Sequence, residues 1–204
     1  GQFHLNPDTR PQRDRLRLDT VRLRGMYNQQ VHGSKRSLRS IEDFTEFEQR
    51  TAYFNGDPIR AMKKGMNVID RLQVAHMAQI QNMIDFPPAP RLDPMTGRLD
   101  RARASQQEIA GEDLFFGKAR CVTCHQPPAY TDHMLHDLFL ERFGAEADGP
   151  IKSFALRGIK DSPPYLHDGR LLTLEDTVEF FNLVAGLQLN GDEKSALVAF
   201  MRAL

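Results

Sequence analysis

Tryptophan is absent from the 204-residue chain, cysteine occurs only twice, and 27 acidic residues balance 27 basic ones. Two cysteines form at most one disulfide, which excludes a disulfide-rich scaffold. The zero net charge argues against non-specific nucleic-acid binding, which requires an excess of Lys and Arg. No apolar run reaches the roughly 18 residues of a membrane span, so the sequence predicts no membrane-spanning helix. The 40% hydrophobic and 26% charged composition is that of an ordinary globular protein.

The charges that cancel overall are unevenly distributed along the chain. Residues 1–40 carry nine basic and three acidic residues, whereas residues 105–204 carry nine basic and fifteen acidic ones. Two solvated faces that partly attract each other would explain this split. The alternative is an acidic docking surface that steers a basic partner protein.

Helical periodicity and capping residues predict a mainly α-helical fold. Ser40, followed by two acidic residues, predicts a helix start, and apolar residues at helical spacing predict one long helix from Pro58 towards Phe86. Capping signals predict three further helix starts, at Ser105, Thr173 and Asn190.

A repeat and a proline-rich segment define the expected domains. Leu23-Arg24-Gly25 recurs 133 positions later as Leu156-Arg157-Gly158, and Ile41-Glu42-Asp43 recurs at the same offset. Several ordered matches at one offset indicate a duplicated unit. Prolines and glycine predict a linker over residues 87–103, which leaves one unit at 1–86 and another at 104–204.

The motif that carries chemistry is Cys121-Val122-Thr123-Cys124-His125. Two thiols on one turn can form thioethers to the vinyl groups of one haem, and the adjacent histidine can ligate its iron. Three alternatives compete: a redox dithiol, which would need a thioredoxin-like context, a strained disulfide, and a zinc site completed by His133 and His136. Haem c is the favoured reading, with zinc second. Since such haem is attached outside the cytoplasm, we expect a periplasmic or other extracytoplasmic location, although no export signal opens the chain.

With its flanking motifs, residues 104–204 resemble the bacterial di-haem cytochrome c peroxidase and MauG-type family. The resemblance rests on the haem motif, on Leu156-Arg157-Gly158, on Pro164-Tyr165-Leu166-His167-Asp168-Gly169 and on Thr173-Leu174-Glu175. It implies a cytochrome c-like haem domain, preceded by the distal part of a second such unit without its own haem motif. At the 133-residue offset the first haem motif would lie before Gly1, so we expect it on a missing N-terminal part or on a separate chain.

The resemblance implies an oxidoreductase that reduces hydrogen peroxide or relays electrons to a second haem. Its partner would be a small cytochrome or a cupredoxin. The alternative is a non-enzymatic c-type cytochrome subunit of a larger redox complex. Relatives also bind calcium through main-chain oxygens, here those of Ser162 and Pro164.

The chain departs from the family at positions that matter for catalysis. It lacks the tryptophan that many relatives place between their haems, and Phe181 occupies the position of their second axial ligand. Glu46 and Glu48 are weak candidates for the acid–base residue. The sixth iron ligand stays open between no ligand at all and four side chains, Met134, His133, His136 and His167. Arg157 and Lys160 are candidates to neutralise the haem propionates, with surface ion pairs as the alternative.

Overall fold

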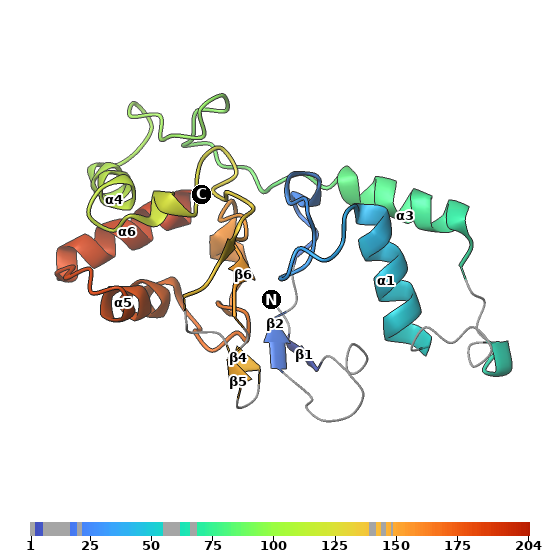
Figure 1. Ribbon diagram of the computed structural model, residues 1–204. Coiled ribbons are helices and arrows are strands. Elements are labelled where there is room, and N and C mark those ends of the chain that lie inside the picture. Colours follow the sequence, from blue (N-terminus) through green and yellow to red (C-terminus); the bar gives the residue numbers. More distant parts are fainter. Residues whose placement is uncertain are drawn as a thin grey trace.

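The computed structural model describes residues 3–5, 17–19, 22–54, 62–65, 69–138, 142–143, 146–147 and 149–204. The chain forms two lobes (Figure 1). The N-terminal lobe contains α1 (Ile41–Phe54) and α3 (Arg71–Asn82). The C-terminal lobe contains α4 (Gln106–Phe116), α5 (Leu174–Val184) and α6 (Gly191–Ala203). The fold is mainly α-helical, as predicted.

Strands are short and pair only locally. The antiparallel pairs are β1 (Phe3–Leu5) with β2 (Arg17–Asp19), β3 (Leu135–His136) with β6 (Ile151–Lys152), and β4 (Arg142–Phe143) with β5 (Glu146–Ala147). Three 3₁₀ turns complete the described elements: η1 (Met26–Asn28), η2 (Cys121–Thr123) and η3 (Ile159–Asp161). Within the described residues, no helix is long and apolar enough to cross a membrane.

Four helix starts agree with the capping signals. Ser105 Oγ accepts a hydrogen bond from the Glu108 N–H at 3.2 Å, and the Glu108 carboxylate accepts one from the Ser105 N–H at 2.7 Å. Thr173 and Asn190 form the same reciprocal capping box. Ser40 Oγ accepts from the Asp43 N–H at 3.1 Å. These bonds satisfy N–H groups that the first turn of a helix leaves unpaired.

The prediction of one long helix after Pro58 is wrong for the described residues. Residues 62 and 63 are helical, residues 64 and 65 form a turn, and α3 begins only at Arg71. The reason is a capping box that sequence periodicity overlooks: Asp70 accepts from the Gln73 N–H, and the Gln73 side chain accepts from the Asp70 N–H, both at 2.8 Å. A capping residue in the extended conformation, such as Asp70, starts a helix and cannot lie in the middle of one.

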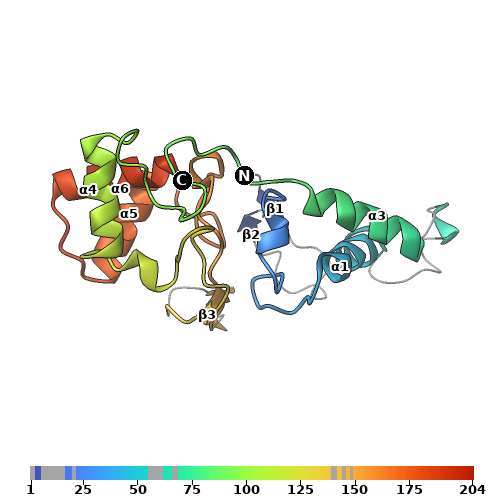
Figure 2. The same cartoon turned by 90° about the horizontal axis from the view of Figure 1, so that it is seen from above.

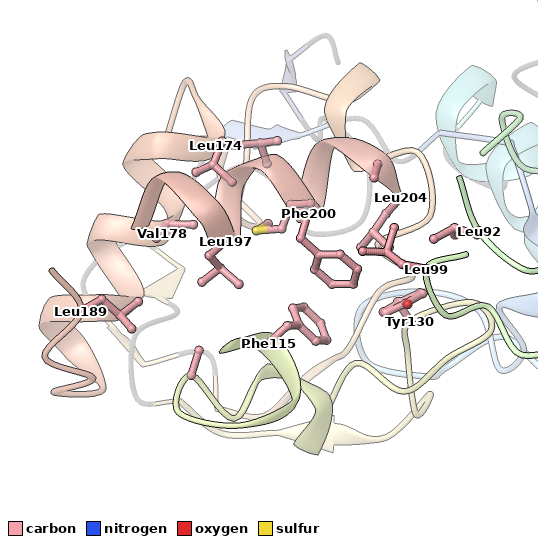
Figure 3. Packing of buried hydrophobic residues seen from close by; sticks show 14 of the residues in the cluster. Leu92, Leu99, Phe115, Tyr130, Leu174, Val178, Leu189, Leu197, Phe200 and Leu204 are labelled. Carbon is pink, nitrogen blue, oxygen red and sulfur yellow. The ribbon is translucent and has the colours of Figure 1, made fainter. Parts of the chain in front are cut away.

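The core of the C-terminal lobe is built on three aromatic rings. Phe115, Tyr130 and Phe200 pack edge to face with centroid separations of 5.2–5.9 Å (Figure 3). Leu92 and Leu99, from the expected linker, join the same core. Residues 87–103 therefore both connect the lobes and pack against the C-terminal one.

A close approach of two helices depends on Gly111 in α4. A Cβ atom there would lie 2.0 Å from the Ala196 carbonyl oxygen and 2.8 Å from the Phe200 Cβ. Only glycine lets the α4 backbone come this near to α6. The contact holds α4 in the place from which it leads directly into the haem motif.

The sequence repeat is also a structural repeat. Gly25 and Gly158 both adopt a left-handed conformation, with φ of 74° and 71°, and each precedes a 3₁₀ turn. Each glycine N–H donates to a carbonyl just after the last helix of its lobe. Gly25 donates to the Ile84 carbonyl and Gly158 to the Leu204 carbonyl, both at 2.8 Å. The elements η1, α1 and α3 thus correspond to η3, α5 and α6.

The tight turns of the two lobes match in register as well. The bridge between His32 and Leu38 corresponds, 133 positions on, to the bridge between Tyr165 and Leu171. His32 therefore occupies the place of Tyr165, and not that of His167 in the similar-looking His-Asp-Gly segment.

One helix of the C-terminal lobe has no counterpart among the described residues of the N-terminal lobe. Counted from the caps Asp70 and Asn190, Ile80 matches Phe200 and Met83 matches Ala203. Phe200 is fully buried against α4, whereas Ile80 and Met83 are 63% and 82% exposed. The face of α3 that corresponds to the α4-covered face of α6 is therefore open.

Candidate haem-attachment site

The two cysteines and His125 lie on one tight turn directly after α4. Arg120, in a left-handed conformation with φ of 54°, turns the chain into η2. The N–H groups of Cys124 and His125 then both donate to the Cys121 carbonyl, at 3.3 and 3.0 Å. This turn places the two thiols and the imidazole within five consecutive residues of one tight turn.

Neither cysteine forms a disulfide bond, and both are partly buried. Burial raises the pKa of Cys121 to about 12, and burial followed by the Asp132 charge raises the pKa of Cys124. Redox dithiols and zinc ligands need environments that lower the thiol pKa and favour the thiolate. The surroundings of these cysteines raise the thiol pKa, so the site lacks the lowered pKa that is typical of a redox dithiol.

The ring of His125 is oriented by Tyr130. The Tyr130 carbonyl oxygen lies 2.9 Å from His125 Nδ1 and accepts a hydrogen bond from it, which leaves Nε2 as the basic nitrogen. Burial is the main cause that lowers the pKa of His125, which favours the neutral ring that iron ligation requires. A backbone carbonyl bonded to the far ring nitrogen is a usual way of fixing a metal-ligating histidine.

Sequence reasoning overlooked the role of Tyr130. Its side chain is fully buried, its hydroxyl donates to the Gly97 carbonyl at 2.7 Å, and its backbone is left-handed with φ of 62°. These contacts fix the carbonyl that orients His125. A tyrosine five residues after the motif carries no signal for this role, because its partner Gly97 is remote in the sequence.

The zinc alternative is not assembled by the fold. His136 Nε2 pairs with the Asp132 carboxylate at 2.7 Å, and His133 lies towards Lys152 at the junction of the lobes. Among the described residues, no three His, Cys, Asp or Glu side chains could hold a metal ion together. The haem donor set of two unpaired thiols and one oriented imidazole is the set that the residues fit.

The candidates for the sixth ligand and for the acid–base residue lie in different surroundings. Met134 is half-exposed beside Arg36, whereas His167 lies in a tight turn closed by the Gly169 N–H and the Leu166 carbonyl. Phe181 packs edge to face on its neighbour Phe180. Glu46 forms an ion pair with Arg71 at 3.2 Å. The side chain of Glu48 lies outside the described residues.

Arg157 is committed to main-chain carbonyls. Its guanidinium donates to the carbonyls of Leu204 and Pro87, both at 3.1 Å. Lys160 is exposed on η3. Arg157 thus holds the chain end and the connection between the lobes.

Ser162 and Pro164, the expected calcium residues, lie at the end of η3 and just before the His167 turn. The repeat relates them to Gln29 and Val31 in the N-terminal lobe. The carbonyls of Gln29 and Val31 both accept hydrogen bonds from the Lys152 ammonium group, the latter at 2.9 Å. The same turn in the other lobe therefore presents two carbonyl oxygens to one positive charge.

The fold and the attachment turn are those of a c-type cytochrome domain, and the N-terminal lobe repeats the 3₁₀ turn η3 and the two helices α5 and α6 of that domain. Comparison with known proteins extends this. The chain is 32% identical over 152 residues to a cytochrome c551 peroxidase of Nitrosomonas europaea, covering 67% of this chain and 44% of the relative. It is 30% identical over 151 residues to the cytochrome-c peroxidase IdrP2 of Denitromonas iodatirespirans, covering 52% and 41%.

The methylamine utilization protein MauG of Methylorubrum extorquens is 29% identical over 119 residues, covering 50% of this chain and 32% of that protein. The chain is thus a relative of the bacterial di-haem cytochrome c peroxidases and MauG proteins. It spans 41–44% of the length of the two peroxidases. No protein-family model matches it.

Solved structures agree on the fold. A MauG-like protein associated with microbial copper homeostasis superposes with a TM-score of 0.69 at 19% identity, covering 91% of this chain and 72% of that one. Hydrazine synthase of Kuenenia stuttgartiensis gives 0.68 at 16% identity, covering 98% and 75%. Both matches cover more than nine-tenths of the chain and thus both lobes.

Proposed function

We propose that the chain is a haem-carrying portion of a di-haem oxidoreductase of the cytochrome c peroxidase type. It would reduce hydrogen peroxide or relay electrons to a second haem. The observation that carries this proposal is the attachment turn, where two unpaired thiols adjoin an imidazole whose Nδ1 is bonded to the Tyr130 carbonyl. The homology to peroxidases and MauG proteins supports the same reading.

Each residue of the site has a defined task. Cys121 and Cys124 would hold the haem covalently, and His125 would ligate its iron. When bound, the haem supplies a one-electron redox centre whose potential depends strongly on its axial ligands. The Tyr130 carbonyl keeps the His125 ring in one tautomer and one orientation. The aromatic core behind the turn makes the position of that carbonyl rigid.

The open face of α3 supports a two-haem assembly. In the C-terminal lobe, α4 covers the matching face of α6 and leads into the haem motif. We place the first haem motif after a helix that covers Ile80 and Met83 in the same way. That helix belongs either to a longer form of this polypeptide or to another chain.

Specific observations favour a second candidate, a non-enzymatic c-type cytochrome subunit of a larger redox complex. Phe181, which cannot ligate iron, stands at the position of the family's second axial ligand. Glu46 is occupied by Arg71 at the protein surface. The chain also lacks a tryptophan for electron relay. Each feature removes a residue that peroxide chemistry uses in the family.

Further parts of the proposal concern the surroundings of the protein. The redox partner would be a small cytochrome or a cupredoxin, and the location periplasmic, since covalent haem attachment takes place there. A calcium ion at the carbonyls of Ser162 and Pro164 is supported by the way Lys152 binds the equivalent pair. Carbonyl oxygens are ligands that calcium prefers.

Two measurements on the native protein test the function. Intact mass under denaturing conditions should show one covalent haem for this chain, and Cys121→Ser with Cys124→Ser should remove it. In the second measurement, the haem-loaded native protein is reduced anaerobically and mixed with hydrogen peroxide, and it should give turnover with a cytochrome donor. A haem-free mass would overturn the attachment itself. A low-spin spectrum that does not change on addition of peroxide or cyanide would contradict the peroxidase function and support the cytochrome-subunit function.

A further inference from the structure

Lys152 extends from the C-terminal lobe into the N-terminal one. It lies in β6, on the side of its lobe that faces the other lobe (Figures 1 and 2), and is only 3% exposed. Its backbone N–H donates to the Ser34 carbonyl at 2.9 Å, and its ammonium group binds the carbonyls of Gln29 and Val31. A positive charge is thus buried and held in place between the lobes.

Three more basic side chains gather around this ammonium group: His32, Arg36 and His133. The pKa of His32 is lowered to about 4, mainly by burial; the positive charges of Lys152 and His133 act in the same direction, and the Glu42 carboxylate opposes them. Burial, Lys152 and Arg36 lower the pKa of His133, and burial and Arg36 lower that of Lys152 to about 8. We call His32, Arg36, His133 and Lys152 the junction cluster.

The junction cluster contains polar atoms that the described part of the chain does not satisfy. His32 Nε2, Arg36 Nε and His133 Nδ1 are buried without a hydrogen-bond partner among the described residues, and His32 is only 2% exposed. A buried polar atom left unpaired costs about 1–3 kcal/mol. Arg36 Nε is always a donor, and each of the two imidazole nitrogens is a donor in one of its tautomers, so an acceptor could satisfy all three beside the ammonium group.

Among the described residues, no carboxylate is bonded to these three nitrogens. Glu42 and Asp132 are the acidic groups that act on the two histidines from nearby. Asp132 is already bound by Ser153 Oγ and by His136, the latter at 2.7 Å. No ion pair joins a carboxylate to Arg36 or Lys152 in the described residues, so both cations lack a carboxylate partner there.

The cluster lies close to the attachment turn. The Asp132 N–H donates to the Cys124 carbonyl at 2.9 Å, and His133 is the next residue. A haem carries two propionate carboxylates, whereas Arg157, expected to neutralise them, is bound to the carbonyls of Leu204 and Pro87. The junction cluster therefore offers unused donors in the neighbourhood of a dianionic cofactor.

We propose that the junction cluster is a binding site for a carboxylate or similar oxyanion. Arg36 Nε and the two imidazoles are the donors, and Lys152 is the fixed positive charge. A haem propionate and a free anion such as inorganic phosphate share this chemistry. Assignment to the propionate rests on the proposed function, whereas a free anion would bind whether or not the chain is a peroxidase.

The test uses the haem-loaded protein and three variants. Arg36→Gln removes the charge and Nε, Arg36→Lys restores only the charge, and Lys35→Gln removes a neighbouring charge whose ammonium group donates to the Pro150 carbonyl. For each protein, the thermal midpoint is followed during titration with inorganic phosphate at constant ionic strength. The reduction midpoint of the haem is measured in parallel.

With a free anion as the occupant, phosphate raises the thermal midpoint saturably, and Arg36→Gln weakens phosphate binding roughly tenfold or more, as expected for a lost charged hydrogen bond. With a propionate as the occupant, phosphate has no effect. In that case Arg36→Gln lowers the reduction midpoint because it removes a positive charge that favours the reduced haem. Arg36→Lys lies in between and Lys35→Gln resembles the parent chain under either occupant.

Two results overturn the proposal: Arg36→Gln and Lys35→Gln behaving alike in both measurements, or neither measurement responding to Arg36→Gln. Loss of peroxidase activity is not a readout of this test. A chain without covalent haem would refute the proposed function, and the phosphate titration would still decide whether the cluster binds an anion.

Discussion

The two lobes repeat one succession of elements, yet they bury hydrophobic cores of different size. In the C-terminal lobe α6 packs between α4 and α5, and a cluster of aromatic and aliphatic residues fills the space. In the N-terminal lobe the buried cluster is Met26, Ile41 and Ala78, with Phe44 against it. The same turns and caps thus form with or without a third helix.

This difference shows which part of the unit is autonomous. The 3₁₀ turn, the bridge and the capped helix are local, because their hydrogen bonds join residues near in sequence. The apolar core is not local, because it requires α4. Since small cores supply little stability, the N-terminal lobe should open more readily than the C-terminal one.

The largest expected effect comes from truncating matched positions on α6 and α3. Phe200→Ala should lower the free energy of unfolding by about 3–5 kcal/mol because it empties the aromatic core. Ile80→Ala, at the matching position, should change it by less than about 0.5 kcal/mol, since the side chain is exposed. Urea unfolding of the haem-loaded chain measures both.

The Ile80→Ala variant can also be measured in an assembly in which another helix covers α3. In a longer polypeptide or a complex that supplies the missing helix, Ile80→Ala should become as costly as other core truncations, about 2–5 kcal/mol. A neutral Ile80→Ala in that assembly would refute the placement of the first haem motif against α3.

The second effect concerns the matched turn residues His32 and Tyr165. Burial lowers the pKa of His32 from 6.5 to about 4, so the unfolded chain binds a proton between these values and the folded chain does not. Stability should therefore fall as the pH drops from 6.5 to 4, by up to about 3 kcal/mol, and level off below.

His32→Tyr, which copies the residue of the other lobe, should flatten this slope. The comparison is made by urea unfolding at pH 7 and pH 4.5 in a buffer without phosphate. Tyr165→Phe is the control and should leave the acid dependence unchanged. An equal slope in the His32→Tyr variant would mean that His32 is protonated in the folded state.

Much of this architecture could be predicted from the sequence, and the reasons are local. The haem motif and the four helix starts depend on residues within about five positions of each other, where spacing decides geometry, and the repeat is visible as short matches at one offset. The length of α3 could not be predicted, because the Asp70 capping box interrupts an apolar pattern that looks continuous. The junction cluster could not either, since its members are up to 120 residues apart in the sequence.

The third effect tests the close approach of α4 to α6. Gly111→Ala should destabilise the chain by about 1–3 kcal/mol, because the new methyl group would meet the Ala196 carbonyl and backbone must move. Gly191→Ala is the matched control, since nothing lies within 4 Å of its added Cβ. Thermal unfolding should show the loss only for the first variant, and a neutral Gly111→Ala would mean that the helices can separate freely.

The smallest effect compares the equivalent caps Asp70 and Asn190. Their side chains accept hydrogen bonds from the N–H groups of Gln73 and Glu193 at 2.8 and 2.9 Å. Alanine at either cap should cost about 1 kcal/mol, whereas Asp70→Asn and Asn190→Asp keep an acceptor and should cost little.

The informative result is which part of the molecule loses stability in each alanine variant. Because α6 is packed on two sides, Asn190→Ala should lower the global free energy of unfolding. Because α3 is open on one face, Asp70→Ala should instead speed amide exchange within α3 and leave exchange in α6 unchanged. Equal acceleration in both helices would show that the lobes unfold as one unit.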